Sequence, residues 1–233
     1  MLNVKQFRYA ADNLSYVIFG REEAMVIDGG AVGEITAFLE KTKLALRFVA
    51  NTHGHPDHTL GNVSLLKKYG ARRLKPEELP DRFEIGIDGH KILVVQTPGH
   101  TDDSACFHAE SFLMTGDTLF NGTIGNCFSG SDRNFYQSIK KLMTLAGHTI
   151  IYAGHDYVRD AMAFARRLGP DNEEIDAYLS RYHPDHIFSR LDEEFKVNLY
   201  LRFNDPKLIK ILREKRLPVA TEWQRWQSLM TLD

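Results

Sequence analysis

The segment from Thr52 to His58 places four side chains that can bind a metal ion within six residues: His53, His55, Asp57 and His58. A glycine and a proline stand between them and favour a tight loop, on which the four side chains can converge. Imidazole nitrogens and carboxylate oxygens are the usual ligands of zinc and of comparable divalent cations. Without a cation, groups packed so closely would repel or desolvate one another. The segment therefore predicts a metal site.

Three later residues extend this set. His100, Asp117 and His155 each follow a short apolar stretch and a glycine, so they can reach the same edge of a sheet. With the first four they make five histidines and two aspartates, which is more than one tetrahedral zinc takes. The set therefore indicates two ions. Two cations about 3.5–4 Å apart can hold a hydroxide between them and polarise a carbonyl.

Alternating strands and helices must position these residues. Short apolar runs bounded by glycine or polar residues predict strands, and apolar residues at helical spacing predict helices. The expected strands are 14–19, 24–27, 47–50, 83–87, 92–96, 105–109, 112–114 and 149–152, and the expected helices are 32–42, 60–69 and 135–145. Several of these strands end just before a candidate ligand, where open α/β folds place their chemistry.

The composition changes near Val158, after which helical patterns dominate. The expected helices there are 158–168, 173–182, 191–199 and 206–215. We therefore divide the chain into a catalytic domain, residues 1–160, and a C-terminal helical region, residues 161–233. The segment His183 to His186 repeats the His-Pro-Asp-His sequence of the first cluster, but we interpret it as a turn between helices because it lacks a partner on a nearby strand.

The bulk composition excludes several classes of function. The chain has 233 residues, 29 basic and 31 acidic, which gives no general affinity for nucleic acid or for an anionic membrane. The N-terminus lacks a signal-peptide pattern, and no apolar run reaches the roughly 20 residues of a membrane span. Two cysteines are too few for a disulfide framework, and Cys106 is expected in the core. We expect a cytoplasmic protein, and the sequence favours no particular oligomeric state.

The segment His53 to His58 resembles the His-x-His-x-Asp-His signature of the metallo-β-lactamase superfamily, and the chain is most similar to glyoxalase II, the hydroxyacylglutathione hydrolases. The similarity covers nearly the whole chain. The supporting segments are Thr97 to Thr101, Thr115 to Phe120, Tyr152 to Tyr157, Phe164 to Arg166 and Leu191 to Phe195.

The resemblance implies an α/β fold, an αββα sandwich with a C-terminal helical appendage. It implies two divalent metal ions per chain, with zinc as the first expectation and iron or manganese as alternatives. It also implies the division of the ligands. His53, His55 and His100 would hold one metal, Asp57, His58 and His155 would hold the other, and Asp117 would bridge the two.

The implied activity is hydrolysis of a small-molecule thioester, S-2-hydroxyacylglutathione, by a metal-bridging hydroxide. Asp57 would be catalytic, orienting the hydroxide while it binds metal. The leaving thiolate has a pKa of about 8.5, so it can depart without a strong general acid. Asp28 is interpreted either as a hydrogen-bond acceptor for a ligand histidine or as a plain turn residue.

The resemblance also suggests substrate contacts. Tyr157 matches the family tyrosine that follows the last histidine ligand, and Arg202 matches a family arginine that could pair with a glutathione carboxylate. Asn126 stands where the family usually has a basic residue, and Phe128 stands where a tyrosine hydroxyl often contacts the peptide. These two departures make a thiol carrier other than glutathione an open alternative.

Two other activities share this signature. One is a mononuclear-iron persulfide dioxygenase, which the segment Gly154 to Tyr157 partly matches. The other is a lactonase or another hydrolase on the same fold. The long helical region after His155 favours the thioester hydrolase.

Overall fold

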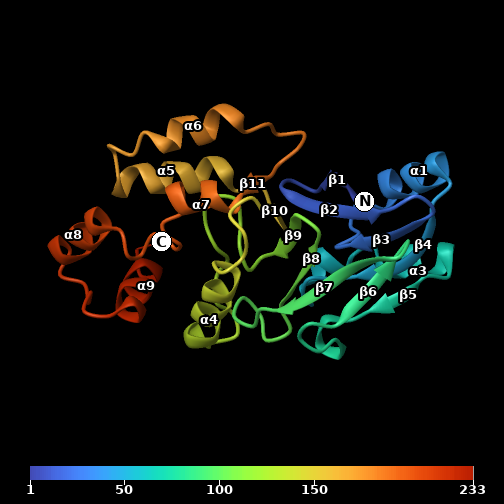
Figure 1. The fold of residues 1–233 in the computed structure, drawn as a ribbon, viewed down its shortest axis with the longest axis horizontal. Helices are drawn as coiled ribbons and strands as arrows, with labels where there is room; N and C mark the ends of the chain where they lie inside the picture. The colour runs from blue at the N-terminus through green and yellow to red at the C-terminus, as the bar shows by residue number, and fades with distance from the viewer. Residues whose placement is uncertain (233) are drawn as a thin grey trace.

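The computed structural model describes residues 1–232, which form two β-sheets packed face to face with helices on their outer sides (Figure 1). The first sheet contains β1 (Asn3–Tyr9), β2 (Asn13–Phe19), β3 (Glu23–Ile27), β4 (Ala45–Ala50) and β5 (Arg72–Leu74), in that order. The second contains, from edge to edge, β11 (Ser189–Arg190), β10 (Ile150–Ala153), β9 (Phe112–Gly116), β8 (Ala105–Ala109), β7 (His90–Gln96) and β6 (Glu84–Ile87). The expected αββα sandwich is confirmed.

The strands of the first sheet are apolar on both faces because each face packs against a different layer. In β2, Tyr16 and Ile18 belong to the core shared with the second sheet, whereas Val17 belongs to a second core beneath the outer helices. Alternate side chains of a strand point to opposite faces, so one strand serves both cores. Its apolar run was therefore recognisable as a strand, in agreement with the expected 14–19.

Helices cover the outer faces of both sheets. Helix α1 (Val32–Thr42) and helix α3 (Asn62–Tyr69) pack on the first sheet through Ile35, Leu39 and Leu65. Helix α4 (Asp132–Leu142) covers the second sheet. It begins three residues earlier than the expected 135–145, because the Ser131 hydroxyl caps it by accepting from the Asn134 amide at 3.4 Å.

The expectation of a tight loop for the first ligand cluster is partly wrong. Residues Pro56–Thr59 form a single helical turn, α2, which begins directly after His55. Proline at the first helical position has its φ angle already set for a helix, and its missing N–H is not needed there. This turn places Asp57 and His58 near His155, which follows the end of β10.

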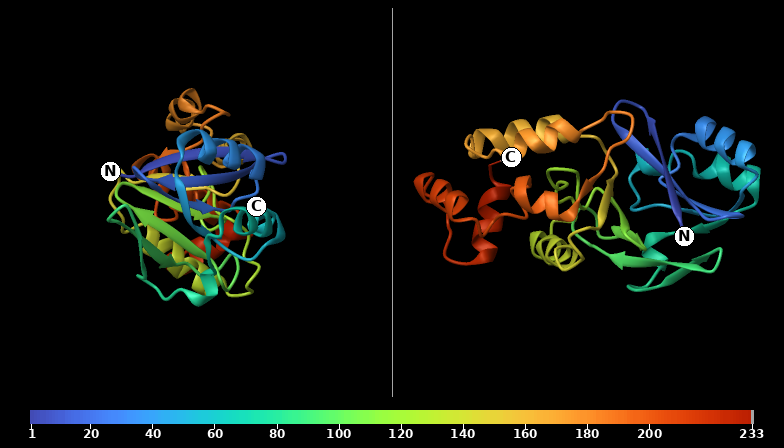
Figure 2. Two further views of the ribbon diagram at one scale, coloured as in Figure 1. Left: turned by 90° about the vertical axis from the view of Figure 1, so that its right-hand side faces the viewer. Right: turned by 45° about the horizontal axis from the view of Figure 1, so that its top comes forward.

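The C-terminal region is helical, as expected, and lies at one end of the elongated molecule (Figures 1 and 2). Its helices are α5 (Val158–Leu168), α6 (Glu174–Arg181), α7 (Leu191–Val197), α8 (Pro206–Glu214) and α9 (Glu222–Met230). Strand β11, from within this region, pairs with β10 of the second sheet. The proposed division at residue 160 falls inside α5.

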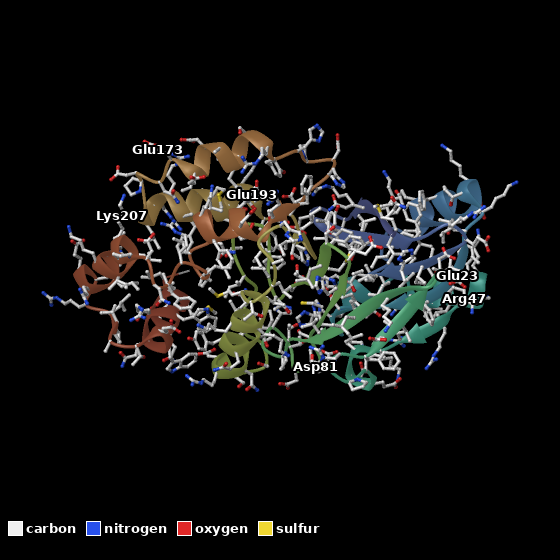
Figure 3. The ribbon with its side chains drawn as sticks, viewed as in Figure 1. Glu23, Arg47, Asp81, Glu173, Glu193 and Lys207 are labelled. Carbon is white, nitrogen blue, oxygen red and sulfur yellow. The ribbon has the colours of Figure 1, made fainter. Side chains whose placement is uncertain are left out.

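Several elements were absent from the expectations: β1, β5, β11, α9 and the short 3-10 helix Pro76–Glu78. The ends of the molecule are marked by labelled side chains in Figure 3, with the Glu23–Arg47 pair at the far end of the first sheet and Lys207 on α8 at the opposite end. Within residues 1–232, no helix has the length and apolar character needed to cross a bilayer.

Candidate metal centre

The candidate ligands lie where strands of both sheets end. His53 follows β4, His100 follows β7, Asp117 comes directly after β9, and His155 comes two residues after β10. The turn between β1 and β2 reaches the same place, because the Leu14 amide donates to the Gly154 carbonyl at 2.8 Å. The sandwich therefore gathers at one edge residues that are far apart in the sequence.

Three histidines form the first ligand set. Nδ1 of His55 lies 2.9 Å from Nε2 of His53 and 3.1 Å from Nε2 of His100. His53 and His100 are buried, whereas His55 is half-buried. Three ring nitrogens converging at one point match the arrangement that a divalent cation needs.

The second set contains Asp57, His58 and His155. Nε2 of His155 lies 3.2 Å from Nε2 of His58 and 3.4 Å from Oδ2 of Asp57. The Asp57 side chain is 43% exposed, so this set faces the outside on the carboxylate side. It too offers two imidazole nitrogens and an oxygen at one point.

Asp117 lies between the two sets. Its Oδ2 is 3.6 Å from Nε2 of His100 and 3.4 Å from Nε2 of His155, and its Oδ1 is 3.4 Å from Nε2 of His58. The carboxylate is buried, and Oδ1 has no hydrogen-bond partner within the described chain. His53, His58 and Asp117 also form a compact group of their own. A buried carboxylate oxygen without a donor, facing ring nitrogens, fits a cation better than it fits a closed protein network.

The outward-facing ring nitrogens are fixed by other groups. Nδ1 of His58 lies 2.9 Å from Oδ2 of Asp28, and Nδ1 of His155 lies 2.9 Å from Oδ1 of Asp12. Nδ1 of His100 donates to a backbone carbonyl at 2.9 Å. Such contacts hold Nε2 as the free, ligand-facing nitrogen. Of the two interpretations of Asp28, the structure supports the acceptor.

Asp12, in the β1–β2 turn, and Asn13, the first residue of β2, were missed from the sequence. Besides Asp12, Asn13 donates its side-chain N–H to Oδ2 of Asp57 at 2.9 Å. An Asp-Asn pair is an ordinary turn signal. Only the pairing of β1 with β2 brings the turn to the metal centre, and β1 was not among the expected strands.

The electrostatics of the cluster are those of paired opposite charges. Burial lowers the pKa of His53 to about 4, which keeps this imidazole neutral and able to bind a cation. Burial alone would also lower the pKa of His58, but Asp28 and Asp117 outweigh it and raise that pKa well above its ordinary value. Burial would raise the pKa of Asp117, yet His155 and His58 hold it far below its usual range. A divalent cation supplies the same counter-charge as these protons.

Glycine is required next to the central carboxylate. A Cβ on Gly154 would lie 2.2 Å from Oδ1 of Asp117, and one on Gly125 would lie 2.0 Å from the Asp117 backbone oxygen. A side chain at position 154 would collide with the carboxylate itself, and one at position 125 would collide with the Asp117 backbone. The two glycines let the loops before His155 and after Asp117 close tightly around it.

The candidate substrate residues fall into two places. Tyr157 stacks on His155 with ring centroids 5.2 Å apart, and it shares with Asn126 the lining of a cavity of about 290 Å³. The Phe128 ring is 64% exposed and packs edge-on against His55 at 5.5 Å. Arg202 lies elsewhere: it pairs with Asp205 and lines a separate cavity of about 600 Å³.

The second His-Pro-Asp-His segment stays apart from the centre. His183, Asp185 and His186 belong to none of the potential metal-binding groups found among residues 1–232, and they lie between α6 and β11. Cys106 is fully buried in the core, as expected.

Known proteins share both the sequence pattern and the fold. The family model described as "Metallo-beta-lactamase superfamily" matches residues 9–83 and 73–155. A curated hydroxyacylglutathione hydrolase from Chromohalobacter salexigens is 31% identical over 83% of this chain and 83% of its own length. One of the same name from Pseudoalteromonas translucida is 28% identical over 100% of this chain and 97% of its own length.

Solved structures agree on the fold. The ETHE1 structure from Myxococcus xanthus has a TM-score of 0.69 at 21% identity, over 97% of this chain and 99% of that chain. A metallo-beta-lactamase structure from Staphylococcus aureus has a TM-score of 0.67 at 22% identity, over 97% of this chain and 71% of that chain. With the family model and the curated relatives, these matches show that the chain belongs to the metallo-β-lactamase superfamily and, within it, to the hydroxyacylglutathione hydrolase family.

Proposed function

We propose that this chain cleaves a thioester, and that its substrate is an S-2-hydroxyacylglutathione. The observation that carries the proposal is the pair of ligand sets with the buried carboxylate of Asp117 between them. The hydroxyacylglutathione hydrolase name of the curated relatives supports the choice of substrate.

The donor groups fit two divalent cations. His53, His55 and His100 would hold one, Asp57, His58 and His155 would hold the other, and Asp117 would lie between them. The unpartnered Oδ1 of Asp117 is the atom that most clearly needs a cation. Bound there, the cations would lower the pKa of a water molecule and polarise the substrate carbonyl. We propose zinc, with iron or manganese as alternatives that the same ligands accept.

Asp57 is the proposed catalytic side chain. Its carboxylate is half-exposed and is held by Asn13, so it can orient an attacking water molecule and accept its proton. No serine or cysteine nucleophile is needed, because a thiolate with a pKa of about 8.5 is a good leaving group. The buried Cys106 has its pKa raised to about 12 by burial, which makes it unsuitable as a nucleophile.

The proposed substrate contacts are Tyr157, Asn126 and Phe128, which lie beside the ligand histidines. We propose that the C-terminal region, residues 161–233, contributes to substrate binding through α5, which lines the same cavity as Tyr157. Arg202 remains a prediction from the resemblance, since its guanidinium is occupied by Asp205.

The decisive experiment measures hydrolysis and metal content on one sample. The purified chain is assayed on S-lactoylglutathione, on other thioesters and on a lactone, and its bound metals are quantified. We expect about two metals per chain and turnover of S-lactoylglutathione above that of the lactone. Preference for the lactone would replace the thioesterase assignment by a lactonase.

The same sample tests the persulfide dioxygenase alternative. Oxygen uptake is recorded with glutathione persulfide as the substrate. One iron per chain together with oxygen consumption would contradict the hydrolase. Full metal content without oxygen use agrees with it.

A further inference from the structure

A cavity of about 290 Å³ lies between the loop after β9 and helix α5, and we call it the α5 cavity. The loop contributes Phe120 and the segment from Thr123 to Asn126. Tyr157 stands at the start of α5, and its ring stacks on His155. The α5 cavity therefore adjoins the second ligand set.

Arg167 is the one cation among the residues that line this cavity. Its guanidinium lies 5.1 Å from the centroid of the Phe164 ring, which supports it by a cation–π contact. Within residues 1–232 it has neither a hydrogen bond nor an ion pair. The next residue along the helix differs: Arg166 is bound to Asp176 at 2.5 Å. The structure thus leaves one of two adjacent arginines without an anion.

One acidic residue also lines the α5 cavity. Asp160 precedes Arg167 by seven residues, so it lies on the same face of α5 about 10.5 Å away along the helix axis. It has no ion-pair partner in the described chain either. The cavity is therefore polarised, negative toward Tyr157 and positive toward the C-terminal end of α5. A carboxylate is favoured only at the Arg167 end.

The two positions that the resemblance offered for binding a carboxylate do not serve here. Position 126 is an asparagine, and Arg202 is paired with Asp205 in a different cavity. An arginine fork binds a carboxylate through two parallel N–H donors, which requires that it be free of another anion. Arg167 meets this condition, and it lines the same cavity as Tyr157, which stacks on the ligand His155.

We propose that Arg167 determines specificity by binding a carboxylate on the thiol half of the substrate. This inference rests on the proposed thioester hydrolysis, but the binding measurement below tests it without any hydrolysis. The class of substrate is a thioester of a peptide-like thiol that carries a carboxylate remote from the sulfur. Asp160 disfavours a second carboxylate near Tyr157 and favours a cationic group there.

The kinetic test compares two thioesters that share an acyl group. S-lactoylglutathione carries carboxylates, whereas S-lactoyl-N-acetylcysteamine is neutral. For Arg167→Met, we expect the ratio of kcat/KM between the charged and the neutral substrate to fall about tenfold, mainly through KM. Arg167→Lys should restore part of the ratio. The matched control is Arg166→Met, whose ratio should equal that of the wild type. An unchanged ratio for Arg167→Met would overturn the inference.

A binding measurement separates this inference from the proposed function. The metal-loaded protein is titrated with S-hexylglutathione, a thioether that cannot be hydrolysed. We expect Arg167→Met to raise Kd about tenfold, while Arg166→Met leaves it near the wild-type value. If the wild type hydrolyses no thioester but this difference holds, the proposed function fails and the carboxylate site stands. Equal Kd values for Arg167→Met and the wild type overturn the site, whatever the enzyme hydrolyses.

Discussion

At the residue scale, Asp28 and Asp12 fix which nitrogen of His58 and of His155 faces the metal centre. The two aspartates differ in their surroundings. Asp28 is buried and also accepts from the amide and the hydroxyl of Thr52 at 2.8 and 2.7 Å. Asp12 has a side chain that is 38% exposed. We therefore expect the two aspartates to contribute similarly to metal affinity but unequally to the stability of the fold.

Replacing either aspartate by asparagine tests this difference. We expect both Asp28→Asn and Asp12→Asn to weaken metal binding about 10–100-fold, because an amide that can also donate replaces the charged, acceptor-only carboxylate that fixes the tautomer of each histidine. Only Asp28→Asn should also destabilise the metal-free protein, by about 1–3 kcal/mol, because a buried acceptor becomes mismatched. Competition with a chelator measures the affinity, and denaturant unfolding measures the stability.

The control for this pair is Asp88→Asn. Asp88 accepts from the amides of Glu22 and Glu23 at the start of β3, whereas Asp28 follows the end of that strand. Its replacement should leave metal affinity unchanged. If Asp12→Asn binds metal as tightly as Asp88→Asn does, the contact with His155 has no effect on the centre.

The ligand residues could be proposed from the sequence because their chemistry is unusual at short spacing. Four ligand side chains within six residues and three further ones after apolar strands leave few alternatives. Asp12 and Asn13 could not be proposed, since a polar pair in a turn is common and only the tertiary pairing brings it to His155. The role of Arg167 could not be proposed either, because nothing in the local sequence distinguishes Arg167 from Arg166.

At the element scale, sequence reasoning succeeded where an element is strongly amphipathic and failed at the edges. Helices α1 and α5 have the predicted bounds, since their apolar residues repeat at helical spacing. Strand β1 was missed because Gln6 is its only buried residue, and β5 was missed because two of its three residues are arginines. Both edge strands form because a neighbouring strand pairs with them, which local sequence does not encode.

The link between helix α7 and the loop after β9 depends on a fully buried carboxylate, Glu194. It accepts from the Gly122 amide at 2.9 Å, from the Asn198 side chain at 2.9 Å and from the Tyr178 hydroxyl at 2.6 Å. No basic side chain is among these partners. Burial raises the pKa of Glu194 above its usual value despite the hydrogen bonds it accepts.

This shift predicts a pH-dependent stability. A carboxyl whose pKa is higher in the folded than in the unfolded state stabilises the fold below its unfolded pKa of about 4.5, and this contribution is lost as the pH rises through the folded pKa. Glu194→Gln cannot ionise. We therefore expect the free energy of unfolding of this variant, relative to the wild type, to increase as the pH rises from about 4.5 to 7.

Denaturant unfolding of both proteins across this pH range measures the difference, in which the other titrating groups cancel. Glu194→Ala is the second variant. It removes the acceptor of the buried Gly122 amide and leaves the Asn198 side chain with the Thr123 carbonyl as its acceptor. Because this variant cannot ionise either, it should follow the pH trend of Glu194→Gln but be less stable than Glu194→Gln by about 1–3 kcal/mol at every pH. A pH-independent difference between Glu194→Gln and the wild type would show that Glu194 has the same pKa folded and unfolded.

At the scale of the whole molecule, the helical region and the sandwich share one core. Leu191, Tyr200 and Trp226 belong to the same cluster of buried residues as Phe135 and the inner strands. Strand β11 completes the edge of the second sheet beside β10. The two parts recognised from composition therefore depend on each other for burial.

A truncated chain tests this dependence. We expect residues 1–160 alone to be insoluble or unfolded, because the cut falls inside α5, removes β11 and exposes the apolar faces of β10 and α4. Circular dichroism and thermal unfolding of the fragment measure the outcome. A fragment that unfolds cooperatively with a metal site intact would show that the sandwich is an independent domain.

Metal binding should stabilise the entire fold, because the ligands come from both sheets and are assembled only when the chain is folded. A cation at 100 times its Kd stabilises the folded state by about 2.7 kcal/mol. For a chain of this size, that corresponds to a fall in Tm of about 5–10 °C when a chelator removes the metal. Addition of zinc should reverse the fall. His55→Ala removes a ligand of the first set alone, so its chelator-induced shift should be smaller than that of the wild type. Elemental analysis confirms that the metal has been removed. If Tm is then unchanged, the metal binds the folded and the unfolded chain equally well. In that case these seven residues do not form a centre that depends on the fold.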